Sequence, residues 1–172
     1  MVGLNILFII IVGSLFHFIF DWCGRPKWIA WLLPTNESVW KHLKMIVYPF
    51  LLTILLDLNF CFDNHNYWFA KFISILSACI LCAALFYGYY FFKKKSILWL
   101  NILIYILAVM AGCDFGYLFL TVPALNLEIV GMAGCMLLPI LFILFTYFAP
   151  ERGIFVDPLT GKAGIFKNCH KK

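Results

Sequence analysis

The sequence predicts an all-α fold, a polytopic integral membrane bundle of about five transmembrane helices. Three observations support this class. The 172 residues are 65% hydrophobic and only 12% charged, whereas a soluble domain carries about 25% charged residues. Apolar runs long enough to cross a bilayer recur along the chain. Basic residues gather in alternate connections between these runs. We therefore expect one bundle at residues 1–149 and a cytoplasmic tail at residues 150–172.

The first predicted span covers residues 2–20 and ends beside two ionisable side chains, His17 and Asp21. These stand four residues apart, so they share one face of a helix. Residues 22–34 follow, and they are too few to cross a membrane. Their tryptophans favour the headgroup level of a bilayer. This segment is therefore expected to form a short interfacial elbow between the first two spans.

Residues 35–44 are the densest polar run of the chain, and they open the second predicted span at residues 38–60. We expect Thr35 or Asn36 to cap this helix. Glu37 would then lie in the first helical turn, where the helix dipole favours an acidic side chain.

Three further spans are predicted, at residues 67–92, 97–120 and 129–149. Pro49 is expected to kink the second span, because proline cannot donate a helical hydrogen bond. Gly112 and Gly116 in the fourth span, and Gly131 and Cys135 in the fifth, have the spacing that allows close helix approach. These residues predict a tightly packed hairpin of the last two spans.

The tail contains a turn signal at Asp157, Pro158 and Gly161. Asp favours the first corner of a turn, Pro presets φ, and Gly tolerates a positive φ. Apolar residues flank the turn on both sides. We therefore expect a small hairpin or loop that docks under the bundle.

The distribution of basic residues predicts the orientation of the chain. With the N-terminus outside, 12 of the 13 Lys and Arg residues lie on the inner side, and only Lys71 lies outside. The positive-inside rule then places the protein in the cell (cytoplasmic) membrane with its C-terminus in the cytoplasm. The net charge of +5 reflects this topology, so no nucleic-acid partner is expected. Membrane lipids are the expected surroundings. A homodimer or a partner membrane subunit is also open, because five spans are few for a self-contained transporter.

The stretch Asn36-Glu37-Ser38-Val39-Trp40-Lys41-His42-Leu43-Lys44 resembles the signature motif of a family of small bacterial integral membrane proteins, domain-of-unknown-function family 6512. The position of His17 and the tail stretch that begins Asp157-Pro158-Leu159-Thr160-Gly161 are similar to two further landmarks of that family. One departure is Lys41, where the family pattern has Glu. The resemblance implies a membrane fold and marks one face of it, but it implies no activity.

The candidate polar site gathers the ionisable and polar residues that the predicted orientation brings to the cytoplasmic face: His17, Asp21, Asn36, Glu37, Trp40, His42 and Lys44. Polar groups in apolar spans usually face a bundle interior or an aqueous cavity. A structural interpretation has Asn36 as a cap, Glu37 paired with Lys41, His17 paired with Asp21, and Trp40 as an interface anchor. Our working hypothesis is instead a ligand-handling or transport-related site.

The remaining alternative is a membrane-embedded hydrolase, either with or without zinc. The sequence requires no cofactor, but His17, Asp21, Glu37 and His42 are residue types that bind Zn²⁺. Secondary candidates are Asp57, Asp114 and Asp157. Asp57 and Asp114 lie towards the outer ends of their spans, where they are expected to be solvated at headgroup level or to form a polar pair between the second and fourth spans.

Overall fold

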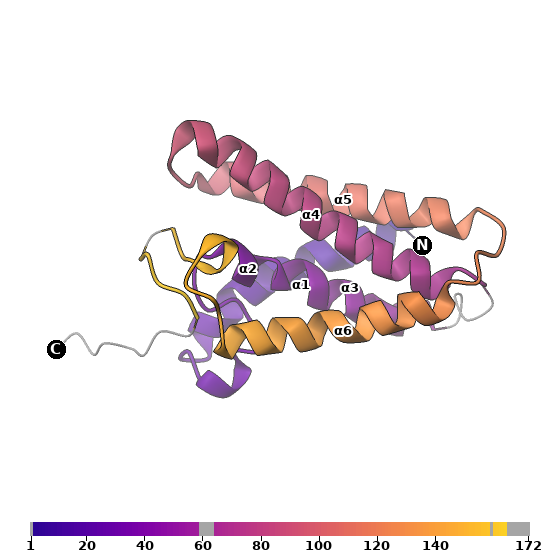
Figure 1. The fold of residues 1–172 in the computed structure, drawn as a ribbon, viewed down its shortest axis with the longest axis horizontal. Coiled ribbons are helices and arrows are strands. Elements are labelled where there is room, and N and C mark those ends of the chain that lie inside the picture. The colour runs from indigo at the N-terminus through magenta and orange to yellow at the C-terminus, as the bar shows by residue number, and fades with distance from the viewer. Residues whose placement is uncertain (1, 59–63, 159, 165–172) are drawn as a thin grey trace.

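In a computed structural model that describes residues 2–58, 64–158 and 160–164, the chain forms a bundle of α-helices (Figure 1). The long helices are α1 (Val2–Trp22), α3 (Lys44–Asp57), α4 (Tyr67–Lys93), α5 (Leu98–Leu120) and α6 (Glu128–Tyr147). The short ones are α2 (Val39–His42) and the 3-10 turns η1 (Lys27–Ile29) and η2 (Gly153–Phe155). These bounds fall close to the five ranges that the sequence predicts.

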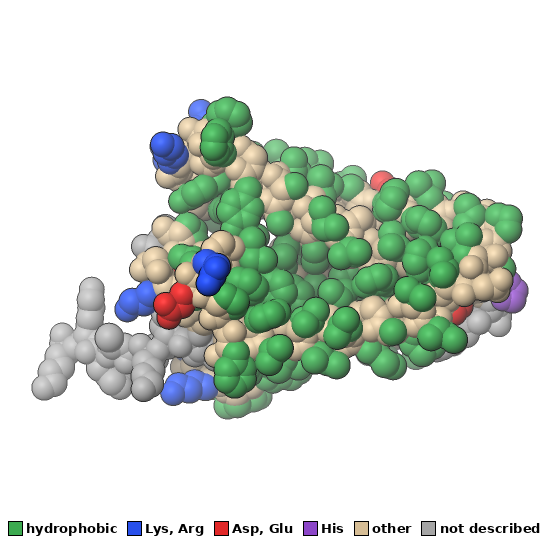
Figure 2. Space-filling model, viewed as in Figure 1, with side chains coloured by type: hydrophobic (Ala, Val, Ile, Leu, Met, Phe, Trp, Pro, Cys, Tyr) green, Lys and Arg blue, Asp and Glu red, His purple; other side chains and the backbone are tan. Residues whose placement is uncertain are grey.

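Five segments of the described chain are long and apolar enough to cross a membrane: α1, the joined pair α2 and α3, α4, α5 and α6. Large apolar side chains cover the sides of the bundle (Figure 2). Ile129 at 83% and Trp99 at 79% are among the most exposed. An apolar exterior of this extent is compatible with a multi-pass membrane protein.

Helix α4 packs against both α5 and α6, and α1 packs against α3 and α5. Helix α3 also contacts α4 and α6, so it completes the interior of the bundle. Small residues set the closest of these contacts. A Cβ on Gly112 would lie 2.6 Å from Ala78 Cβ, and one on Gly116 would lie 2.8 Å from the backbone oxygen of Ala70. Both glycines therefore allow α5 to approach α4.

The predicted hairpin of the last two spans needs a correction. A Cβ on Gly131 of α6 would collide with the backbone of Trp68 and Phe69 in α4. The small residues of α5 and of α6 thus face α4 rather than each other. A small-xxx-small pattern marks a face for close packing, but it does not say which helix fills that face.

The elbow after α1 contains η1, which Pro26 precedes in an extended conformation. Trp28 lies within η1 and is 72% exposed. Tyr48 of α3 donates a hydrogen bond of 2.9 Å to the backbone oxygen of Trp31. This contact ties the elbow to the bundle.

The described part of the tail folds back on itself. Val156 and Ala163 form an isolated antiparallel bridge. Asp157 starts the turn between them: the Gly161 amide donates to the backbone oxygen of Asp157 at 2.8 Å, and Gly161 has a φ of +68°. The predicted turn is therefore present in the tail.

Candidate functional site

The polar stretch at residues 35–44 begins α2 through Ser38. The Ser38 hydroxyl accepts the backbone N–H of Lys41 at 3.4 Å and donates to Asn36 Oδ1 at 2.8 Å. Asn36 Oδ1 also accepts the Ser38 backbone N–H at 3.2 Å. The expectation that Thr35 or Asn36 caps the helix was therefore wrong. Ser38 is the N-cap, and Asn36 holds it in place.

Three side chains from two elements converge beside this cap. His17 of α1, Glu37 and His42 each offer one ligand atom, and these atoms lie within 4.8 Å of one another. His42 Nε2 is 3.4 Å from Glu37 Oε2, and the two imidazole rings have centroids 5.4 Å apart. The buried Nδ1 of His17 has no hydrogen-bond partner among the described residues. His17 therefore offers a ring nitrogen that no described residue binds.

The geometry of His42 suits a metal ligand. Its Nδ1 lies 3.1 Å from the backbone oxygen of Ser38. A carbonyl can only accept, so Nδ1 is the donor in this contact, and Nε2 is the ring nitrogen that remains to face a metal ion. Metal-binding histidines commonly donate their second ring nitrogen in this way. Neighbouring ligand atoms on a tetrahedral zinc ion lie about 3.3 Å apart, and the His42–Glu37 separation of 3.4 Å already matches this spacing.

A cavity of about 340 Å³ adjoins the cluster. His17, Glu37 and His42 form part of its lining, and α1 to α5 supply the rest. Most of the other lining side chains are apolar, including Phe18, Val39, Met45, Phe86, Leu98, Ile102 and Ile104. The three candidate ligands therefore lie at one side of an apolar chamber.

Asp21 lies outside the cluster, so the predicted pairing of His17 with Asp21 was wrong. Asp21 instead accepts a hydrogen bond of 2.6 Å from Arg25 Nε, and both side chains are exposed. This hydrogen bond and the charge of Asp21 raise the pKa of Arg25. Asp21 is thus an exposed ion-pair partner and not a candidate metal ligand in this geometry.

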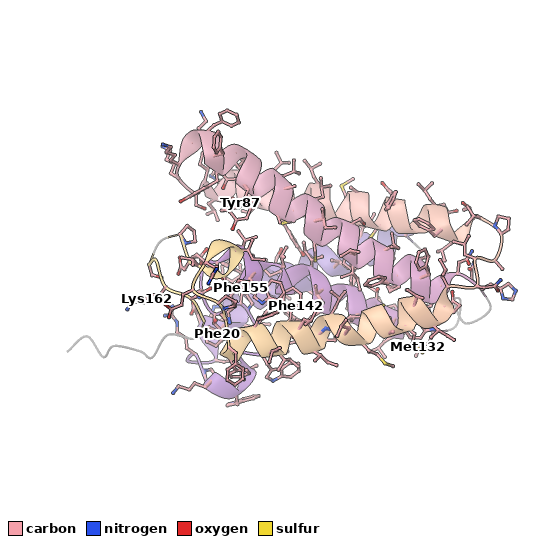
Figure 3. All side chains as sticks on the ribbon, viewed as in Figure 1. Phe20, Tyr87, Met132, Phe142, Phe155 and Lys162 are labelled. Carbon is pink, nitrogen blue, oxygen red and sulfur yellow. The ribbon has the colours of Figure 1, made fainter. Side chains whose placement is uncertain are left out.

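Trp40 is not an interface anchor. Its ring stacks on Phe142 of α6 with centroids 4.2 Å apart, and it lies 4.9 Å from the ring of Phe155 in the tail. Figure 3 labels Phe142 on α6 and Phe155 in η2, the two rings that Trp40 contacts. Trp40 therefore joins α2, α6 and the tail in one aromatic cluster.

Lys41 and Lys44 are buried and bind backbone oxygens. Lys41 Nζ donates to the Thr146 oxygen at 3.4 Å, so the expected pairing of Glu37 with Lys41 was wrong. Lys44 Nζ donates to the oxygens of Ala30 at 2.6 Å and Leu33 at 3.2 Å. Lys44, a predicted member of the polar site, thus holds the elbow instead of joining the cluster.

The comparisons with known proteins give one match. The model of a family of unknown function, DUF6512, covers residues 1–165. The chain belongs to this family. No curated protein and no solved structure matches it. The DUF6512 assignment agrees with the resemblance seen in the motif, and it adds no activity.

The secondary candidates of this DUF6512 protein have separate environments. Asp57 is 3% exposed and accepts from Lys71 Nζ at 2.7 Å, Asn5 Nδ2 at 2.9 Å and the Tyr67 hydroxyl at 3.1 Å. Asp114 is exposed, so Asp57 and Asp114 do not form the polar pair that was considered. Headgroup-level solvation was likewise wrong for Asp57, because a buried ion pair replaces it.

The tail of the DUF6512 protein reaches the motif. Asn36 Nδ2 donates to the Gly164 oxygen at 3.1 Å. Asp157 is buried at 3%, and its Oδ1 accepts the Thr160 amide at 3.4 Å. Asp157 therefore shapes the turn that presents Gly164 to Asn36, and it stands apart from the histidine cluster.

Sequence reasoning missed several polar residues of the cavity, among them Asn101 and Tyr105. They stand four residues apart in α5, on one face of an otherwise apolar helix. That spacing was a usable signal, because polar groups in apolar spans point inward. The Tyr105 hydroxyl donates to the Ile9 oxygen at 2.8 Å.

Proposed function

We propose that this protein is a multi-pass membrane protein that holds one divalent transition-metal ion on His17, Glu37 and His42 and uses the ion to bind a ligand in the adjacent cavity. The convergence of the three donor atoms within 4.8 Å, at the lining of a cavity, is the observation that carries this proposal. In this proposal the metal ion is the group that binds the ligand in the ligand-handling site.

Zinc is the metal that these ligands favour. Two imidazole nitrogens and one carboxylate oxygen form a donor set found in zinc sites with three protein ligands. Such sites keep a fourth position for water or for an exogenous ligand. Calcium and magnesium prefer oxygen ligands throughout. The donor set therefore supports zinc with one position open to the cavity.

Ligand binding agrees better with the cavity lining than hydrolysis does. A zinc hydrolase commonly uses a carboxylate that is not a metal ligand as its general base. The other polar side chains that line this cavity are Ser14, Cys82, Asn101 and Tyr105, and none of them is a carboxylate. Asp21, the acid nearest in sequence to His17, binds Arg25 instead.

The proposal places the five apolar segments across the membrane, with the N-terminus outside and the C-terminus in the cytoplasm. Arg25 and Lys27, the triplet Lys93–Lys95, and Arg152 and Lys162 all follow the ends of helices that run in the same direction. By the positive-inside rule this end of the bundle faces the cytoplasm. The metal cluster then lies at the cytoplasmic membrane boundary.

Metal analysis of the purified protein tests the site. We expect about one zinc per chain after reconstitution with Zn²⁺ and removal of the excess, because three protein ligands are sufficient for a stable site. His17→Ala and His42→Ala should each weaken zinc binding about 10–100-fold or more, the range in which even outer-shell partners matter. Competition with a chromogenic zinc chelator measures this loss.

His65→Ala is the matched control, because His65 is an exposed histidine near the start of α4, at the other end of the bundle. Its zinc affinity should equal that of the wild type. A wild-type protein without stoichiometric zinc, or variants of His17 and His42 that bind zinc as tightly as His65→Ala, would contradict the proposal. Equal melting temperatures of the metal-free variants separate loss of a ligand from loss of the fold.

A further inference from the structure

We infer that the ligand is a membrane amphiphile with an anionic phosphate headgroup, whose phosphate oxygen takes the open position on the metal while its hydrocarbon chain lies in the cavity. This inference rests on the proposed metal site. It identifies the class of ligand, which the three donor residues alone do not.

The walls of the cavity have the chemistry of a hydrocarbon site. Its lining is mostly apolar, and its volume of about 340 Å³ lies within the range of small-molecule pockets, which is about 300–1,000 Å³. A ligand that binds only through a metal needs no such apolar chamber. Apolar lining next to one polar cluster instead matches a molecule with one charged end and one apolar end.

The rim of the cavity opens towards the sides of the bundle. Phe18 of α1 is 51% exposed, and Leu98 and Ile102 of α5 are 65% and 41% exposed, although all three also line the cavity. These residues belong to the apolar exterior that is proposed to face lipid. A molecule already in the membrane can therefore enter between α1 and α5 without crossing water.

The charge around this end of the bundle favours an anion. Lysine and arginine side chains gather at the end that carries the α4–α5 connection (Figure 2). The triplet Lys93–Lys95 ends α4 and begins that connection, and two residues separate it from the rim residue Leu98. Basic residues at a membrane surface attract anionic lipid headgroups. A divalent metal on two neutral imidazoles and one carboxylate adds a net positive charge, to which a phosphate is complementary.

Native mass spectrometry of the intact protein in a neutral maltoside detergent tests the inference. The probes are dodecyl phosphate, inorganic phosphate and a dodecyl ether with an uncharged ethylene glycol headgroup. We expect a one-to-one adduct of dodecyl phosphate that forms about tenfold more tightly with zinc-loaded than with metal-free protein. Inorganic phosphate and the uncharged ether should each bind the zinc-loaded protein about tenfold more weakly than dodecyl phosphate does.

Two substitutions in α5 separate the cavity from the bundle surface. Ile102→Trp places a large ring at the rim, so it should weaken dodecyl phosphate binding about tenfold while zinc binding stays unchanged. Leu103→Trp is the matched control: Leu103 is 50% exposed and faces outward beside the rim. It should bind both zinc and dodecyl phosphate like the wild type. Retained zinc binding shows that Ile102→Trp is folded, and Ile102→Phe provides a milder second variant.

The outcomes distinguish the two proposals. Stoichiometric zinc without a zinc-dependent dodecyl phosphate adduct overturns the inference and leaves the metal site standing. Equal affinity for inorganic phosphate and dodecyl phosphate would identify a free anion as the ligand, which also overturns the inference. Unchanged dodecyl phosphate binding in both Ile102→Trp and Ile102→Phe overturns it as well. Absence of zinc from the wild type removes the metal site itself, and the inference with it.

Discussion

Lys44 and Lys41 show how this sequence places amine side chains inside an apolar bundle. Both side chains are at most 1% exposed. Their long apolar stems pack in the interior, while each Nζ donates to backbone oxygens. Carbonyls at the ends of helices and turns have no partner within the helix. A buried amine satisfies them at the points where the elbow and the end of α6 meet α2 and α3.

Replacing Lys44 with methionine should therefore destabilise the protein although it removes a buried polar group. The stem is preserved, but the Ala30 and Leu33 oxygens lose their donor, and a buried acceptor left unsatisfied costs about 1–3 kcal/mol. Thermal unfolding followed by circular dichroism in detergent measures the lower midpoint. Lys27→Met is the control, because Lys27 is an exposed lysine in the elbow that Lys44 binds. Equal midpoints for the two variants would refute the structural role of Lys44.

Spacing in the sequence identified the faces of the site residues but not their partners. His17 and Asp21 do lie one turn apart, yet Arg25 stands a further four residues along and forms an exposed ion pair with Asp21. Glu37 and Lys41 could pair only inside a helix, whereas α2 begins at Val39. Glu37 therefore lies before the helix and reaches His42. The partner of Glu37 thus depended on the residue at which α2 begins. The sequence did not determine that residue, because several residues of the polar run can cap a helix.

At the scale of elements, Pro49 explains a contact between three helices. Proline has no N–H, so the backbone oxygen of Met45, four residues earlier, loses its helical partner. The Tyr105 hydroxyl of α5 lies 3.3 Å from that oxygen and 2.8 Å from the Ile9 oxygen of α1. Helix α3 continues through Pro49. The missing hydrogen bond in α3 is thus replaced by a contact with α5, and the same hydroxyl of α5 also contacts α1.

A double-mutant cycle tests this connection. Tyr105→Phe should lower stability by about 1–2 kcal/mol, because a buried carbonyl loses its donor. In a Pro49→Ala background the new alanine N–H supplies the Met45 oxygen, so the same Tyr105→Phe change should cost measurably less. Chemical denaturation in mixed micelles gives the four free energies of unfolding. Additive effects would show that the hydroxyl does not substitute for the missing helical hydrogen bond.

The positions of the spans followed from the sequence, whereas the order of packing did not. Long apolar runs and their charged ends are local properties, so α1, α4, α5 and α6 begin and end near their predicted bounds. Which helix fills the glycine face of α5 depends on all five spans together. Gly112 and Gly131 accordingly mark close contacts correctly, but α4 is the partner of both.

Over the whole molecule, the two ends of the bundle use charge differently. At the end where α4 begins, Asp57 and Lys71 form a buried ion pair whose remaining donors and acceptors bind Asn5, Thr53 and Tyr67. Such a pair stabilises only when further hydrogen bonds compensate its desolvation. At the other end the described basic side chains are mostly exposed. One charged pair is therefore neutralised internally, and most of the other described basic side chains are exposed at one end of the bundle.

This asymmetry predicts the orientation of the protein in a membrane. A fluorescent protein fused after Lys172 should fluoresce in a bacterial host, and alkaline phosphatase fused there should be inactive, because both results require a cytoplasmic C-terminus. The proposed topology puts 12 of the 13 basic residues on one side, so the preference rests on many charges. Replacing Lys93–Lys95 with serine should therefore weaken it without reversing it. Fusions at the N-terminus should give the opposite pattern. An active phosphatase after Lys172 would place the cluster of His17, Glu37 and His42 on the outer side and reject the proposed topology.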